Sequence, residues 1–268
     1  MNKATKAQLK QVRELLREKR SRDESGLFVG EGFKIIGDML DKGHIPEFVL
    51  ISADFADDEN NRSFLVELEK RAVPFYGVGS SEFEKISSLR HSQGILAVAR
   101  KPVFSAAEVG QKDKQLIVLC DGIQDPGNLG AMIRTSCAFG ADLLMLSGES
   151  ADVYNPKVVR ASSGIILDIP VVTCVMEDLD RLKNKGYRLL VSSVPGDESA
   201  ELAKMKDLPD RLIVAFGSEG KGVSGDIMDR ADAGFHISIS DNVESLNVAA
   251  AAAVTLYVLG QRKKTGGG

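Results

Sequence analysis

Features of membrane, secreted or disulfide-stabilised proteins are scarce in this sequence of 268 residues. It contains no run of about 18 apolar residues, so we expect no membrane-spanning helix. The amino terminus is basic and lacks the apolar core of a secretory signal, which predicts a cytoplasmic protein without a membrane partner. The three cysteines, Cys120, Cys137 and Cys174, are odd in number and lack metal-ligand spacing. We therefore expect neither a disulfide framework nor a bound metal.

An overall excess of positive charge is also lacking, but the charge is unevenly distributed. The whole chain carries a net charge of −4, whereas residues 1–22 contain eight Lys or Arg against two Glu. A basic amino-terminal helix could contact phosphates, because neutralised phosphates release their counterions. A solvated amphipathic helix explains the same pattern, with an apolar stripe at Leu9, Val12, Leu15 and Leu16.

Alternating strand and helix patterns run through most of the chain and predict α/β architecture. Its length favours two domains, separated by a polar, glycine-containing linker at about 100–113. Residues 115–120 form a continuous apolar run typical of a fully buried strand, so we expect a parallel sheet in the second domain. Residues 26–32 are expected to form a short strand that turns into a helix running to about 41. The other expected strands lie at 47–51, 74–78, 95–99, 115–120, 142–146, 169–172, 188–193, 212–216 and 235–239. The other expected helices lie at 1–22, 61–71, 80–88, 131–139, 155–162, 177–185, 224–230 and 247–260.

Two loops rich in small residues follow neighbouring expected strands near the carboxyl terminus. Residues 217–222 come after the strand at 212–216, and Ser245-Leu246-Asn247 open the last helix. Loops of this kind carry backbone N–H groups that can hold a ligand's polar atoms. We therefore predict a small-molecule pocket at the carboxyl ends of the strands.

A third polar loop, residues 121–130, follows the buried strand at 115–120. Asn128 stands where the next helix needs an amino-terminal cap. Arg134 lies in that helix among apolar neighbours, so we expect a buried guanidinium that pairs with a phosphate or carboxylate of a ligand. An internal ion pair or a surface position is the alternative.

In the first domain, the loop from Arg90 to Gly94 is better suited to recognition than to catalysis.

Residues 220–225 also fit the glycine fingerprint of dinucleotide-binding enzymes. That fingerprint opens a doubly wound domain and is followed by several strand-helix units. Only one strand and one helix follow it here, so we reject this interpretation. The three penicillin-recognising motifs, at Ser218–Lys221, Ser240–Asn242 and Lys264–Gly266, are crowded near the carboxyl terminus, and we treat them as chance.

Three motifs together resemble those of the SPOUT superfamily, in its TrmH/SpoU branch. They are Asp125–Gly130 with Arg134, Phe216–Gly222, and Ile237–Ile239 with Glu244–Ala249. Their order, spacing and strand-loop-helix context agree with that branch over residues 115–260. In the first domain, Phe28–Gly32 with Lys34 and the Gln93-Gly94-Ile95 run resemble its L30e-like substrate-binding domain, although less specifically.

The resemblance implies an α/β fold with a SPOUT methyltransferase domain at residues 114–268, built on a parallel sheet and tied in a trefoil knot. A smaller L30e-like α/β domain, residues 1–104, would bind the RNA substrate. The expected reaction moves a methyl group from S-adenosylmethionine to a ribose 2′-hydroxyl of RNA, with S-adenosylhomocysteine as product. We expect 23S ribosomal RNA as substrate and a homodimer formed through the carboxyl-terminal domain. Transfer RNA as substrate, and a non-catalytic RNA-binding or ribosome assembly factor, stay open as alternatives.

The resemblance also implies site residues, which fall into three groups. The cofactor would be bound by Gly217, Glu219, Gly220, Ile239, Ser245, Leu246 and Asn247. The catalytic group would be Asn128, Arg134, Glu219, Ser245 and Asn247. RNA would be bound by Arg22, Lys34, Arg90 and Arg134.

A guanidinium scarcely deprotonates in proteins, so Arg134 is a poor general base. We instead expect Arg134 to pair with the target phosphate and the developing oxyanion. Glu219 or a substrate phosphate would then accept the proton of the hydroxyl. Charge compensation at a helix amino terminus is the alternative role for Glu219.

Overall fold

The computed structural model describes residues 1–104, 114–193, 199–205 and 208–265, with side chains described as far as Gly260. The chain forms two compact units. One comprises Met1–Pro102 and Tyr154–Leu167, and the other comprises Val103–Val153 and Asp168–Gly268. Most of the predicted linker, residues 105–113, lies outside the described residues.

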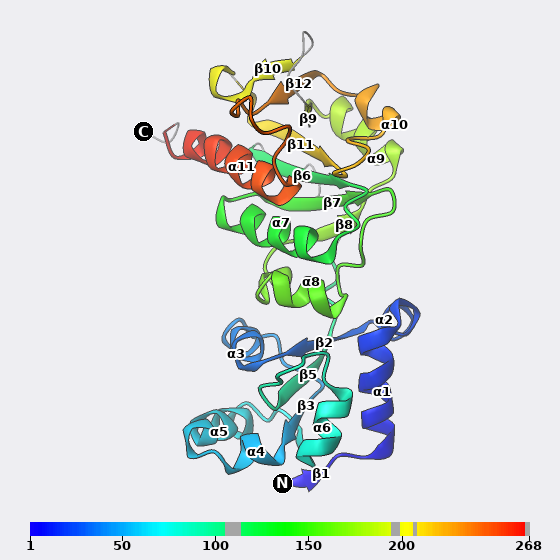
Figure 1. Cartoon of the computed structure of the whole chain (residues 1–268), viewed down its shortest axis with the longest axis vertical. Coiled ribbons are helices and arrows are strands. Elements are labelled where there is room, and N and C mark those ends of the chain that lie inside the picture. The colour runs from blue at the N-terminus through cyan, green and yellow to red at the C-terminus, as the bar shows by residue number, and fades with distance from the viewer. Residues whose placement is uncertain (105–113, 194–198, 206–207, 266–268) are drawn as a thin grey trace. The chain divides into compact units, whose positions relative to one another are not determined.

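The first unit is built on a five-stranded mixed sheet in the order β1-β4-β3-β5-β2 (Figure 1). β1, β4 and β3 run parallel, and β5 is antiparallel to both β3 and β2. The strands are β1 (Asn2–Lys3), β2 (Leu27–Glu31), β3 (Phe48–Ser52), β4 (Phe75–Val78) and β5 (Ile95–Arg100). The helices are α1 (Lys6–Arg17), α2 (Lys19–Ser25), α3 (Phe33–Asp41), α4 (Ala53–Asp57), α5 (Arg62–Lys70), α6 (Ser80–Ile86) and α8 (Pro156–Ala161).

Both faces of this sheet are covered, as β3 shows most directly. Phe48 and Leu50 belong to a core cluster that includes Leu9, Val12 and Leu15 of α1. Val49 and Ile51 belong to a second cluster with residues of α3 and α5. Because successive side chains of a strand point to opposite faces, the first four positions of β3, Phe48–Ile51, are all apolar rather than alternately so.

The segment Tyr154–Leu167 packs within the first unit although it lies between two strands of the second unit in the sequence. The Tyr154 ring lies 5.1 Å from the Phe28 ring, and the Lys101 ammonium lies 5.1 Å from the centre of the Tyr154 ring. Arg160 of α8 donates a 3.3 Å hydrogen bond to the Ser88 hydroxyl. The predicted boundaries, 1–104 and 114–268, assign this segment to the other domain.

The second unit contains a seven-stranded parallel sheet in the order β10-β12-β9-β11-β6-β7-β8 (Figure 1). The strands are β6 (Gln115–Asp121), β7 (Leu143–Ser147), β8 (Val171–Thr173), β9 (Arg188–Ser192), β10 (Ser199–Glu201), β11 (Arg211–Gly217) and β12 (Ala233–His236). The helices are α7 (Pro126–Ala138), α9 (Met176–Asn184), α10 (Gly225–Met228) and α11 (Val248–Thr265). The predicted fold class, an α/β chain with a parallel sheet in its carboxyl-terminal part, is confirmed.

Two local predictions in this unit are wrong. The expected cap residue Asn128 is not the cap of α7, because Asp125 holds that position and its carboxylate accepts from the Asn128 backbone N–H at 2.8 Å. Pro126 then occupies the first turn, where no donor N–H is needed. The strand expected at 235–239 ends at His236, so Ile237 and Ile239 lie beyond the ladder.

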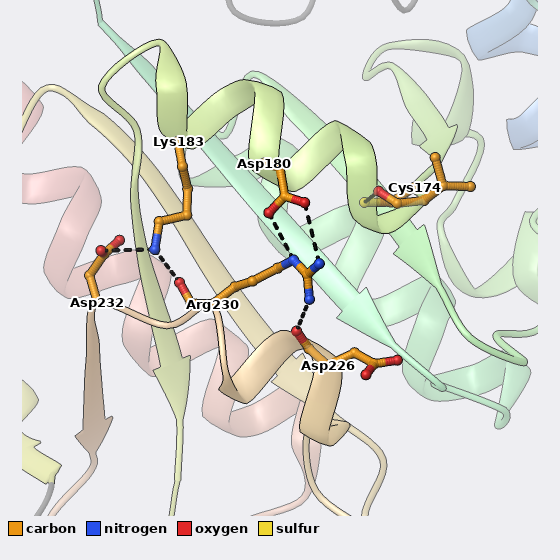
Figure 2. Close-up of polar contacts among 7 residues, drawn as sticks. Cys174, Asp180, Lys183, Asp226, Arg230 and Asp232 are labelled. Atoms are coloured by element: carbon orange, nitrogen blue, oxygen red, sulfur yellow. Dashed lines mark hydrogen bonds and ion pairs between the residues drawn. The ribbon is translucent and has the colours of Figure 1, made fainter.

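Polar contacts join α9 to the segment between α10 and β12 (Figure 2). Arg230 donates to both carboxylate oxygens of Asp180, at 2.9 and 3.2 Å, and to the Asp226 carbonyl at 2.7 Å. Lys183 pairs with Asp232 at 3.0 Å, and its ammonium also donates to the Arg230 carbonyl. These contacts join α9 to α10 and to the segment that follows α10.

None of the helices in the described part of the chain combines the length and apolarity that a membrane-spanning segment needs. Among the same described residues, no group of three or more His, Cys, Asp or Glu side chains could hold a metal ion.

Candidate functional site

A cavity of about 360 Å³ lies where three neighbouring segments leave the parallel sheet. β9 and β11 are adjacent and parallel, so the residues that follow their carboxyl ends meet at one edge. The segment before α11 closes the cavity. The cavity is lined by Ser192, Ser193, Phe216, Gly217, Ser218, Glu219, Gly220, Gly222, Ile237, Ile239, Glu244, Ser245, Leu246, Val248 and Ala251.

Six of the seven residues predicted to bind the cofactor line this one cavity. They are Gly217, Glu219, Gly220, Ile239, Ser245 and Leu246. The seventh, Asn247, does not line it, but its side-chain amide reaches Glu219. The predicted convergence of three separated loops is therefore present in the structure.

The loop after β11 folds back onto the end of its own strand. Gly222 donates its backbone N–H to the Ser218 carbonyl at 2.9 Å, and the two residues form an isolated antiparallel bridge. A Cβ at Gly217 would lie 1.9 Å from the carbonyl carbon of Gly222. This close approach explains why a glycine ends β11, because any side chain there would force the loop off the strand.

A second cavity, of about 600 Å³, is also lined by this loop. It shares Ser218, Glu219, Gly220, Gly222 and Val248 with the first cavity. Its further lining residues are Asp121, Gly122, Ile123, Gln124, Asp125, Asn128, Gly148, Glu149, Lys221 and Ser224. Glu219 thus borders both cavities.

Three predicted catalytic residues form a hydrogen-bonded cluster at this border. The Asn128 and Asn247 amides both donate to Oε1 of Glu219, at 3.0 and 2.7 Å. Asn247 also donates to the Asn128 side-chain carbonyl at 3.0 Å. The Asn247 side-chain oxygen accepts from the backbone N–H groups of Ala249 and Ala250, at the start of α11. The cap of one helix therefore also orients the carboxylate.

Two predicted catalytic residues, Arg134 and Asn247, line neither cavity, although Asn247 is hydrogen-bonded to Glu219. Arg134 lies on α7, and its side chain is exposed, so the expectation of a buried guanidinium is wrong. The buried positions of α7 are Leu129, Gly130, Met132, Ile133 and Ser136. Arg134 points away from that face, and spacing in the sequence could not show which face meets the sheet.

The other residues predicted to bind RNA differ in accessibility. Arg22 is buried, with 2% of its surface exposed, and donates to the Leu15 carbonyl, so its prediction as an RNA contact is wrong. Lys34 is exposed and forms a 2.7 Å ion pair with Asp38 one turn further along α3. Arg90 is exposed in the loop before β5.

Several cavity residues were not predicted from the sequence, of which Ser192 and Ser193 are the most informative. They end and follow β9, next to β11 in the sheet. The carboxyl ends of parallel strands meet at one edge, and this is the signal by which the two serines could have been found. The strand order β9-β11-β6, which places them beside β11, cannot be read from local patterns.

The charge and shape of the first cavity define what it can hold. Of the described residues that line it, the charged ones are Glu219 and Glu244, both carboxylates. Phe216, Ile237 and Leu246 provide apolar surface beside them. Its volume falls within the range of roughly 300–1,000 Å³ that small-molecule sites occupy. The cavity is suited to a partly apolar ligand with positive charge.

Comparison with known proteins identifies the family. Residues 115–257 match the SpoU rRNA Methylase family, and residues 6–97 match the MRM3-like substrate binding domain. The chain belongs to the SpoU rRNA methylase family. The predicted recognition of the TrmH/SpoU branch is confirmed.

Relatives cover nearly the whole chain. The 23S rRNA (guanosine(2553)-2′-O)-methyltransferase RlmP of Bacillus subtilis is 28% identical over 247 residues, 91% of this chain and 92% of that protein. A solved RNA 2′-O ribose methyltransferase is 25% identical with a TM-score of 0.81, covering 99% of this chain and 100% of that one. An AdoMet-bound rRNA methyltransferase from Sinorhizobium meliloti, 24% identical, shares the fold with a TM-score of 0.82, covering 98% and 97%.

Proposed function

We propose that this SpoU-family enzyme transfers a methyl group from S-adenosylmethionine to a ribose 2′-hydroxyl of RNA, with 23S ribosomal RNA as substrate. The observation that carries the proposal is the convergence of three loops on one cavity whose border holds Asn128, Glu219 and Asn247. Support for the substrate comes from the B. subtilis relative, which is named for a 2′-O-methylation of 23S rRNA.

The first cavity fits S-adenosylmethionine, which would supply a methyl group on a cationic sulfonium centre. Ile239 and Leu246 offer apolar surface for an adenine ring, and Glu219 and Glu244 complement the cofactor's net positive charge. The solved relative from S. meliloti is AdoMet-bound. S-adenosylhomocysteine would leave from the same cavity, and no residue role proposed here requires a metal.

In the proposed reaction, the protein aligns the hydroxyl with the methyl group and stabilises the developing alkoxide. Glu219 accepts the hydroxyl proton directly, or leaves it to a substrate phosphate. Asn128 and Asn247 hold the Glu219 carboxylate, and Ser245 positions the loop before α11. Arg134, exposed on α7 and outside both cavity linings, pairs with a phosphate of the target RNA.

Residues 1–104 are proposed as the RNA substrate-binding domain and residues 114–268 as the methyltransferase domain. The match of residues 6–97 to a substrate binding domain supports this division. Lys34 and Arg90, both exposed, are the proposed RNA contacts of the first domain. The segment Tyr154–Leu167 would stay with the first domain.

We also propose a cytoplasmic homodimer formed through the carboxyl-terminal domain. α11 leaves Val254 and Tyr257 exposed by 41% and 53%, with the Tyr257 ring 5.8 Å from the Phe139 ring. Apolar side chains of this size on a helix surface favour a protein partner. The trefoil knot of the methyltransferase domain stays a prediction.

Radiolabelled methyl transfer tests the proposed function directly. The purified protein is incubated with S-adenosylmethionine and 23S rRNA, and ribose methylation is mapped on the product. We expect one 2′-O-methylated nucleotide. Methylation of transfer RNA alone would instead support the transfer RNA alternative. Absent methyl transfer together with absent S-adenosylmethionine binding in calorimetry would favour the non-catalytic alternative.

A further inference from the structure

Asp121 is the most buried carboxylate in the lining of the second cavity. It ends β6, the strand next to β11, and its side chain is 6% exposed. In the sheet register, it lies between Gly217 of β11 and Ser147 of β7. A buried carboxylate is expensive unless its oxygens are hydrogen-bonded, so its partners indicate what it holds.

The two oxygens of Asp121 bind different parts of the unit. Oδ1 accepts from the Ser147 hydroxyl at 2.7 Å, which is a contact within the sheet. Oδ2 accepts from the backbone N–H of Ser224 at 2.7 Å, which is a contact to a loop. A carboxylate binds a backbone N–H more strongly than a neutral acceptor does, because the bond is charge-assisted.

Ser224 is the point where the loop of the cofactor cavity ends. Gly217 begins the loop beside Asp121 in the register, and Ser224 precedes α10. Asp121 therefore binds Ser224 at the end of the loop, while Gly217 at its start pairs with β6, the strand that carries Asp121. Between these points lie Ser218, Glu219 and Gly220, which line the first cavity.

We propose that Asp121 is a positioning residue for methyl transfer. Its carboxylate fixes Ser224 and thereby keeps the loop in the form that shapes the cofactor cavity and brings Glu219 to Asn128 and Asn247. The effect of Asp121 on catalysis rests on the proposed function. The hydrogen bond between Asp121 and Ser224 does not depend on that function. A loop fixed before binding does not have to be ordered by the ligand, which favours affinity.

Two substitutions at Asp121 separate anchoring from general stability. Asp121→Ala removes both acceptors, and we expect S-adenosylmethionine to bind roughly ten- to hundredfold more weakly, as for loss of a hydrogen bond to a charged group. Asp121→Asn can still accept from Ser224 with its amide oxygen while its NH₂ donates to the Ser147 hydroxyl. We therefore expect Asp121→Asn to restore most of the affinity that Asp121→Ala loses.

Two control variants identify which contact matters. Ser147→Ala removes the sheet contact and leaves the Ser224 bond, so cofactor affinity should be retained. Asp180→Ala removes the contact between Arg230 and α9 (Figure 2), and affinity should again be retained. Equal losses in Ser147→Ala and Asp121→Ala would overturn the proposal, because sheet stability would then be the cause.

Hydrogen exchange of the cofactor-free protein tests the anchor without any assumption about the reaction. We expect Asp121→Ala to accelerate exchange in peptides covering residues 218–227. Peptides from the strands of the parallel sheet should stay protected. Unchanged exchange of these peptides, or acceleration throughout the unit, would overturn the proposal. If the unaltered protein neither binds S-adenosylmethionine nor methylates RNA, the proposed function fails, whereas this comparison still decides whether Asp121 anchors the loop.

Discussion

The Asn247 side-chain amide donates a 2.7 Å hydrogen bond to Oε1 of Glu219, across 28 positions of sequence. The same Asn247 caps α11 through its side-chain oxygen. Both amide bonds to Glu219, from Asn247 and from Asn128, end on a single carboxylate oxygen. The other oxygen, Oε2, receives neither of these two bonds.

Glu219→Gln should lower the rate of methyl transfer by about 10²–10⁴, the usual contribution of a general base. The glutamine oxygen can still accept both amide bonds, so the cluster keeps its shape and only the ability to take a proton is lost. Single-turnover transfer of labelled methyl at saturating cofactor measures this rate. Glu244→Gln removes the other carboxylate of the cavity and should leave the rate unchanged. A normal rate in Glu219→Gln would assign the proton to a substrate phosphate.

Arg134→Lys should reduce methylation of RNA by about tenfold or more, because lysine keeps the charge but loses the bidentate fork. Cofactor affinity should not change, since Arg134 does not line the cofactor cavity. The measurement is kcat and KM for RNA beside the dissociation constant for S-adenosylmethionine. Arg181→Lys, on α9, is the matched control. Near-normal turnover in Arg134→Lys would exclude the proposed role.

Gly217→Ala should disrupt the cofactor loop. The added methyl would overlap the Gly222 backbone, which cannot move aside as a flexible side chain would. Overpacking of this kind destabilises proteins by about 1–3 kcal/mol. Chemical denaturation and cofactor titration would show both effects. Gly225→Ala introduces the same methyl at the start of α10, where no atom beyond its chain neighbours and its own helix backbone lies within 4 Å, and should be tolerated. Equal stability and equal cofactor affinity of the two variants would contradict the close approach of Gly217 to Gly222.

Glu31→Ala should destabilise the first unit and weaken RNA binding. The Glu31 carboxylate, 6% exposed, accepts from the Ser88 backbone N–H at 3.1 Å and from the Ser87 and Ser88 hydroxyls. Its loss removes hydrogen bonds to a charged acceptor, which contribute about 1.5–3 kcal/mol. It also releases the loop that carries Arg90.

Thermal unfolding and RNA gel-shift assays measure the two effects of Glu31→Ala. Glu84→Ala, an exposed carboxylate on α6, serves as the control and should change neither. An unaltered Tm together with full RNA affinity in Glu31→Ala would show that the Glu31 contacts do not hold the loop.

Thiol labelling should distinguish the three cysteines. Burial raises the pKa of Cys120 to about 12, and burial together with nearby Asp178 and Asp121 raises the pKa of Cys174 to about 12. The reactive thiolate is therefore scarce at pH 8 for both. Alkylation of the native protein, read by mass spectrometry, should modify Cys137 first, because its side chain is partly exposed. Rapid labelling of Cys120 would contradict its burial in β6.

Sequence patterns predicted most strands and helices because their signals are local. The apolar run of β6 predicted a buried parallel strand, and the glycines after β11 predicted a ligand loop. The predictions failed where contacts with other elements determine whether a side chain is buried or where a strand ends. Arg22 is buried because its guanidinium reaches back to the Leu15 carbonyl of α1, and β12 ends early where Ile237 and Ile239 turn toward the cavity.

The amino-acid sequence by itself determined the α/β class, the order of the motifs and the residue types available for methyl transfer, since each depends on composition and short-range spacing. Tertiary structure alone decided that Asn128, Glu219 and Asn247 meet, that Arg134 faces outward, and that Asp121 binds Ser224 across 103 positions. The order of strands in a parallel sheet sets these distances, and that order follows from packing of the whole unit rather than from any local pattern.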